Sequence, residues 1–143
     1  MSITIIVIYY GDDMHTGKQY AEKFKAKINQ IGEDVTITYR KRNGYQPTVG
    51  ETYEDIRMDN VKMLIRKTDR SDYEQLPEGL HELDVRKVYF YQKIPYKNAT
   101  ITRCFDNQEY RFITPPVENL FNGANIYYFA FIALKEVQKN VTC

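Results

Sequence analysis

The run Ile3-Thr-Ile-Ile-Val-Ile-Tyr-Tyr10, followed by Gly11, decides the predicted fold. An almost continuous apolar run rich in isoleucine is typical of a strand covered on both faces, as in the centre of an α/β sheet. The run lacks the basic start of a signal peptide and is too short to cross a bilayer. We therefore predict an internal strand at residues 3–10, flanked by layers of helix.

The next segments continue this alternation of strand and helix. Apolar side chains recur every three or four residues over 16–31, with lysines on the other face, which predicts an amphipathic helix ending at Gly32. Residues 35–42 alternate as a strand, and Asn43-Gly44 predicts a tight hairpin turn. A variant capping box at Thr52-Tyr-Glu-Asp55 predicts a second helix to Lys67.

The second half of the chain contains three predicted strands, at 86–93, 99–105 and 108–113. Only Asp106-Asn107 separates the last two, so they must form an antiparallel hairpin. Thr114-Pro-Pro116 predicts the start of a last helix that reaches about residue 139. That helix is apolar around most of its circumference, so it must be buried on more than one side.

Together these elements, in the order β-α-β-α-β-β-β-α, predict one α/β domain over residues 1–143. We expect a three-layer arrangement with a mixed sheet of about five strands, and α+β is the alternative. A length of 143 residues favours one compact unit. The net charge of +1 excludes attraction of the whole molecule to nucleic acid or an anionic membrane, and we expect no membrane partner.

The loop after the first strand is the candidate ligand site, because open α/β sheets bind ligands beyond the carboxyl ends of their strands. Its candidate residues are Tyr10, Gly11, Asp12, Asp13, His15, Thr16, Gly17 and Lys18. The glycines permit close backbone approach, and Lys18 would meet an anion. The spacing fits neither a P-loop nor a dinucleotide fingerprint. The function predicted here is binding of a phosphate-bearing, nucleotide-like small molecule, and an ordinary strand–helix turn is the alternative.

A second candidate site is the predicted hairpin tip, where Arg40, Lys41, Arg42 and Tyr45 form a cationic and aromatic cluster. Such a cluster suits a nucleic-acid binder that stacks on bases. The alternative is a charged hairpin that discourages pairing between sheet edges. No metal site is expected, since a zinc site needs three or four converging ligands. No cofactor is expected either, and no catalytic residue is assigned, so enzymatic activity stays undecided.

The third hypothesis is a non-catalytic protein-interaction or inhibitor protein. The 13 tyrosines suit a recognition surface, because tyrosine joins a large apolar body to one polar tip. The last helix supplies an apolar face for a symmetric homodimer, with Tyr128, Phe131 and Leu134 as interface candidates. The two cysteines form no framework and are expected to be reduced thiols of a cytoplasmic protein.

Overall fold

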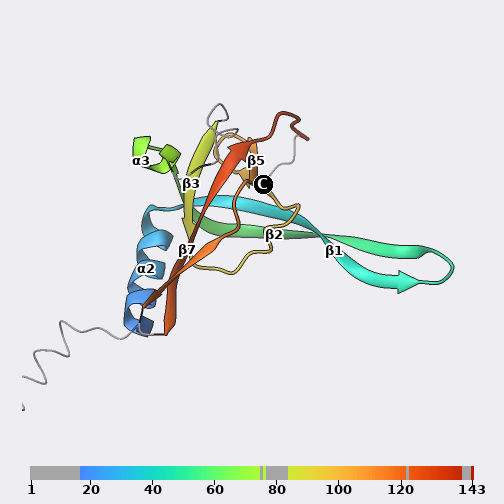
Figure 1. Cartoon of the computed structure of the whole chain (residues 1–143), viewed down its shortest axis with the longest axis horizontal. Helices are drawn as coiled ribbons and strands as arrows, with labels where there is room; N and C mark the ends of the chain where they lie inside the picture. Colours follow the sequence, from blue (N-terminus) through green and yellow to red (C-terminus); the bar gives the residue numbers. More distant parts are fainter. Residues whose placement is uncertain (1–16, 75, 77–83, 122, 140–142) are drawn as a thin grey trace, which may run out of the picture.

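The computed structural model describes residues 17–74, 76, 84–121, 123–139 and 143 (Figure 1). Within these residues one seven-stranded antiparallel sheet dominates, accompanied by two helices, α2 (Gly17–Ile31) and α3 (Arg70–Glu74). The strands are β1 (Glu33–Gln46), β2 (Gly50–Lys67), β3 (Val85–Phe90), β4 (Thr100–Arg103), β5 (Glu109–Phe112), β6 (Val117–Phe121) and β7 (Ala124–Leu134). Neither described helix is long and apolar enough to span a membrane.

The strand order is β3-β2-β1-β4-β5-β7-β6, and β3 also pairs with β7. Six strands therefore form a closed ring, and β6 lies outside it on β7. Every pairing in the described sheet is antiparallel. The predicted three-layer α/β fold with a mixed sheet is wrong, because no described strands form the parallel pair on which it depended. The predicted first strand, 3–10, lies outside the described residues.

Two predicted helices are strands in the structure. Residues 52–67 belong to β2, where partly buried Thr52, Ile56 and Met58 are separated by exposed residues as they pair with β1. The expected C-terminal helix, 114–139, is replaced by β6 and β7. The pattern of an apolar run that is covered on both faces does not distinguish a buried helix from a buried strand. The aromatic and β-branched side chains of β7 favour the strand.

Other predictions are confirmed. The helix at 16–31 corresponds to α2, and Gly32 closes it by donating to the Ile28 carbonyl at 2.8 Å. β4 and β5 form the expected antiparallel hairpin. The turn predicted at Asn43-Gly44 lies elsewhere: β1 continues through Gly44 with an irregular register, and the chain reverses between Gln46 and Gly50.

The core lies inside the ring of strands. Its members are Val35, Ile37, Val61, Met63, Val88, Phe90, Ile94, Ala99, Ile101, Tyr110, Ala130 and Ile132. Helix α2 covers the outside of the sheet at β7, where Phe24 stacks on Tyr127 with ring centroids 4.4 Å apart. β7 is thus covered by the core on one face and by α2 on the other, which explains its apolar composition.

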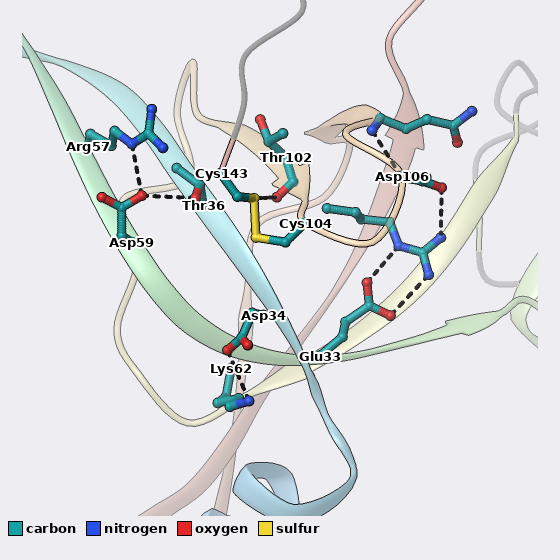
Figure 2. The surroundings of a disulfide bond; sticks show 12 residues. Glu33, Asp34, Thr36, Arg57, Asp59, Lys62, Thr102, Cys104, Asp106 and Cys143 are labelled. Atoms are coloured by element: carbon teal, nitrogen blue, oxygen red, sulfur yellow. Dashed lines mark hydrogen bonds and ion pairs between the residues drawn. A yellow bond between two sulfur atoms is a disulfide. The ribbon is translucent and has the colours of Figure 1, made fainter.

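A disulfide joins Cys104, just after β4, to Cys143, with Cα atoms 5.3 Å apart (Figure 2). The expectation of two reduced thiols is therefore wrong. Cys104 and Cys143 are 39 positions apart in the sequence and show no recognisable spacing pattern, so only the folded chain reveals that they meet.

Candidate interaction arm

The β1–β2 hairpin projects from the ring as a long two-stranded ribbon (Figure 1). β1 pairs with β4 only between Val35 and Thr38, and β2 pairs with β3 only between Leu64 and Lys67. Residues 39–56, which we call the arm, therefore have only each other as strand partners in the described sheet. None of these residues is buried.

A β-bulge sets the direction in which the arm leaves the ring. Val35 pairs with Val61 and Ile37 with Met58, so Asp59 and Asn60 together lie opposite the single residue Thr36. Asn60 adopts a left-handed conformation with φ of 57°, which asparagine tolerates better than most residues. Because a bulge bends its strand and increases the local twist, this one re-aims the ribbon at its root.

Side chains fix the bulge. Asp59 accepts hydrogen bonds from Arg57 Nε at 2.8 Å and from Thr36 Oγ1 at 3.0 Å (Figure 2). These two hydrogen bonds, chiefly that of Arg57, hold the pKa of Asp59 below its ordinary value. At neutral pH the carboxylate is therefore charged, and it ties β1 to β2 where the arm begins.

The root of the arm is further tied to the rest of the sheet. Arg103 on β4 makes a bidentate contact with Glu33, with Nε–Oε1 at 2.7 Å and Nη2–Oε2 at 3.0 Å. The Glu33 hydrogen bonds raise the pKa of Arg103 above its already high value. Lys62 on β2 pairs with Asp34 at 2.9 Å (Figure 2). Both ion pairs lie at the body end of β1, so they hold in place the strand whose other end forms the arm.

The cations that the sequence singled out are neutralised in the arm. Arg40 contacts Asp55 at 3.4 Å, and Arg42 forms an ion pair with Glu51. Lys41 lies opposite Glu54 in the strand register. Exposed ion pairs such as these contribute little to stability, but the arm's three cations are matched by three carboxylates, so the arm has no net charge.

Large apolar side chains gather at the far end of the arm. Tyr45, Val49 and Tyr53 are 68%, 67% and 51% exposed. Arg40 lies over the Tyr53 ring, 5.6 Å from its centroid. The Tyr53 hydroxyl donates to Glu51 at 2.8 Å, and this hydrogen bond raises the pKa of the tyrosine. The tip therefore presents two tyrosines and a valine on a ribbon of zero net charge.

The predicted ligand loop lies mostly outside the described residues, which exclude Tyr10, Gly11, Asp12, Asp13, His15 and Thr16. Gly17 and Lys18 begin α2, and Lys18 is exposed. Gly17 is buried against β6: a Cβ there would lie 2.1 Å from the Phe121 carbonyl oxygen. Close helix–strand packing thus accounts for this glycine, and ligand binding by the loop stays a prediction.

The predicted dimer-interface residues all lie on β7. Phe131 is buried in a second cluster with Leu76, Val85 and Ala133. Tyr128 and Leu134 are partly buried against the main core. None of the three presents an open apolar face, and the homodimer stays a prediction.

A partly buried charged network lies away from the arm, next to α3. Burial of Asp72 favours its neutral form, but the backbone N–H of Asp69 and the Arg66 guanidinium donate to its carboxylate at 3.0 and 2.9 Å. Lys87 adds a contact at 3.5 Å. The opposing effects leave the pKa of Asp72 at about 2. This network braces α3 against β2 and β3.

The residues that the structure describes contain no group of three or more His, Cys, Asp or Glu side chains able to hold a metal ion. Comparison with known proteins gives no family: no family model matches the chain, and no curated protein is significantly similar to it. The proposed function therefore rests on the arm, which the sequence suggested only as a short cationic hairpin.

Proposed function

We propose that the chain is a non-catalytic protein-interaction module that docks through its arm. The observation that carries this proposal is the combination of balanced charge along the arm with exposed Tyr45, Val49 and Tyr53 at its tip. Tyrosines are enriched where protein interfaces concentrate their binding energy. A partner that covers the tip would remove these side chains from water.

The shape of the arm supports the same proposal. A two-stranded ribbon without further strands is marginally stable in water, and beyond Tyr39, which packs against the main core, the arm's side chains contribute nothing to the described core. β2 is 18 residues long and extends well beyond the part that pairs with the body. This extension therefore needs a reason outside the fold. Contact with a partner supplies that reason.

Nucleic-acid binding through Arg40, Lys41, Arg42 and Tyr45 is the alternative use of the arm. Affinity for nucleic acid comes mainly from cations that neutralise phosphates and release counterions. Here each arm cation faces a carboxylate across the ribbon or along it. A bound phosphate would have to displace that carboxylate or lie beside its negative charge. The balanced charge therefore favours a protein partner.

The other functional predictions gain no support from the described residues. The nucleotide-like ligand lost its structural rationale with the parallel sheet, and the homodimer lost the helix on which it was built. The Cys104–Cys143 disulfide weighs against the predicted cytoplasmic location, because disulfides persist mainly in oxidising compartments. We propose such a compartment as the place where the arm meets its partner.

Site-specific photo-crosslinking tests the proposed function. Val49→p-benzoylphenylalanine places the crosslinker at the tip, and Lys27→p-benzoylphenylalanine places it on the exposed face of α2 as the matched control. In extracts of the cells that make the protein, we expect a nuclease-resistant protein adduct from position 49 and none from position 27. Excess wild-type protein should suppress the adduct.

A competitor variant makes the test quantitative. Because truncating a central interface tyrosine costs about 2 kcal/mol or more, the double variant Tyr45→Ser, Tyr53→Ser should compete at least about tenfold more weakly than wild type. Equal competition by this variant would show that the tip does not carry binding. An adduct that nuclease removes would favour the nucleic-acid alternative instead.

A further inference from the structure

A pocket lies where the arm joins the body. Tyr39 and Met58, from the two strands of the hairpin, form one wall, and the segment 93–97 after β3 forms the other. Register places Ile37 opposite Met58 and Tyr39 opposite Ile56, so Tyr39 and Met58 share the face that continues outward from the core. The pocket has a volume of about 590 Å³, within the usual range for ligand sites.

The lining combines an apolar interior with a cationic rim. Ile94 is 4% exposed and belongs to the main core, and Pro95 and Tyr96 continue the apolar wall. Lys93 and Lys97 are both exposed at the two ends of this segment. Within the part of the chain that the structure describes, neither ammonium group forms an ion pair. This contrasts with the arm, where cations and carboxylates are matched.

We propose that this pocket takes a short acidic segment of the partner protein. An apolar side chain of that segment would fill the space between Tyr39, Met58 and Ile94, and carboxylates on either side of it would meet Lys93 and Lys97. This inference rests on the proposed function and names the chemistry of the partner. It follows from charge complementarity, because Lys93 and Lys97 form no ion pair in the described residues and flank an apolar cavity at the root of the arm.

A nucleic acid suits the pocket less well than a peptide. Proteins bind a strand of nucleic acid along a continuous cationic groove. On the arm side of the pocket the nearest cation beyond Tyr39 is Arg40, and its charge is already paired with that of Asp55. The apolar lining mixes the aromatic Tyr39 and Tyr96 with Met58, Ile94 and Pro95, and only two lysines flank it. A single apolar side chain with flanking carboxylates uses everything that the lining offers.

Methyl NMR on the full chain tests the proposal, with the Met58 ε-methyl and the Ile94 δ1-methyl as reporters. The probe is the peptide acetyl-Glu-Glu-Phe-Glu-Glu-amide, compared with its all-Lys counterpart, with a version carrying Ser for Phe, and with a short oligothymidylate. We expect saturable shifts of both methyl groups with the acidic phenylalanine peptide. The basic peptide, the serine peptide and the oligothymidylate should each bind at least about tenfold more weakly, because each lacks either the apolar anchor or the carboxylates.

Matched variants assign the charge effect to the rim. Lys93→Gln with Lys97→Gln should weaken the acidic peptide by on the order of tenfold, since each exposed ion pair contributes up to about a factor of five. Lys18→Gln with Lys27→Gln removes the same charge from exposed positions of α2 and should leave the affinity unchanged. Unperturbed methyl spectra in the rim variant without peptide show that it is folded.

Several results would overturn the inference: no shift at millimolar peptide, equal shifts from the basic peptide or the oligothymidylate, or equal weakening by both pairs of lysine variants. Shifts that grow with protein concentration alone would point to a second copy of the chain and would also overturn it. The crosslink at position 49 is read separately. If it forms while the peptide fails, the partner chemistry is wrong and the docking arm stands; if it does not form, the proposed function is wrong.

Discussion

Removing the arm should leave the body folded, because none of its residues is buried in the described structure. The change is replacement of residues 40–55 by Asn-Gly, a sequence that favours a two-residue hairpin turn between the cross-strand neighbours Tyr39 and Ile56. No residue in the excised stretch is buried. The bulge that Asp59 fixes, and the pairing of β1 with β4, remain in the shortened protein.

The free energy of unfolding should change by no more than about 1 kcal/mol, because an isolated two-stranded ribbon is only marginally stable in water. The side-chain pairs lost with residues 40–55 and the chain entropy that ordering these residues costs act in opposite directions, and none of these residues is buried.

Urea unfolding followed by circular dichroism measures this change, with the disulfide kept oxidised. Ile37→Ala in the intact chain is the positive control, because Ile37 is completely buried next to the root of the arm. It should lose about 2–5 kcal/mol. A loss of more than about 3 kcal/mol on removing the arm, or a shortened protein without cooperative unfolding, would mean that the ribbon is part of the folding unit and would refute the reasoning.

Three further predictions concern the body. Asp72 has a folded pKa of about 2, below its ordinary 3.8, so it should contribute about 2 kcal/mol above pH 4 that is lost as pH falls towards 2; an acid unfolding curve unchanged in Asp72→Asn would contradict this. Reducing the Cys104–Cys143 disulfide, which closes a loop of 39 residues, should lower the free energy of unfolding by about 4 kcal/mol, and equal urea midpoints with and without dithiothreitol would rule that out. Gly17→Ala should cost about 1–3 kcal/mol because its Cβ meets the Phe121 carbonyl oxygen, whereas a neutral effect in thermal melts would disprove the close packing.

The sequence predicted the elements whose periodicity is set locally. α2 has one apolar face and one lysine-rich face, and only a helix separates them. The hairpin of β4 and β5 follows from a short polar turn, where Asn107 accepts a left-handed conformation with φ of 57°. Both predictions needed no knowledge of distant residues.

The wrong predictions involve strands whose partners are far along the chain. β7 is apolar on both faces because the core and α2 cover it, and no local pattern separates such a strand from a buried helix. Likewise, the pairing of residues 50–63 with β1 overrides the helical signal at Thr52-Tyr-Glu-Asp55. Propensity is a weak guide where tertiary pairing decides.

The candidate site was visible in part. Arg40, Lys41 and Arg42 stand out as cations in the sequence, but their charges are balanced only once Glu51, Glu54 and Asp55 lie on the neighbouring strand. The sequence places Glu54 and Asp55 in a predicted helix instead. Gly44 was interpreted as a turn, whereas the strand passes through it with φ of 112°. Because the strand continues past Gly44, the arm is longer than the predicted hairpin.

Closure of the ring decides where the described chain can meet another protein. In the described sheet every ring strand pairs on both sides over part of its length, and unpaired edges are left along the arm, over residues 57–63 of β2 and on the outer side of β6. Exposed edges invite pairing with other chains unless charges, prolines or short strands interrupt them. The charged side chains of the arm, Pro47 at its turn and the five-residue length of β6 all act in this way. Strand addition is therefore disfavoured, and we expect the proposed partner to engage side chains: the tyrosines and valine at the tip, and the apolar pocket at the root.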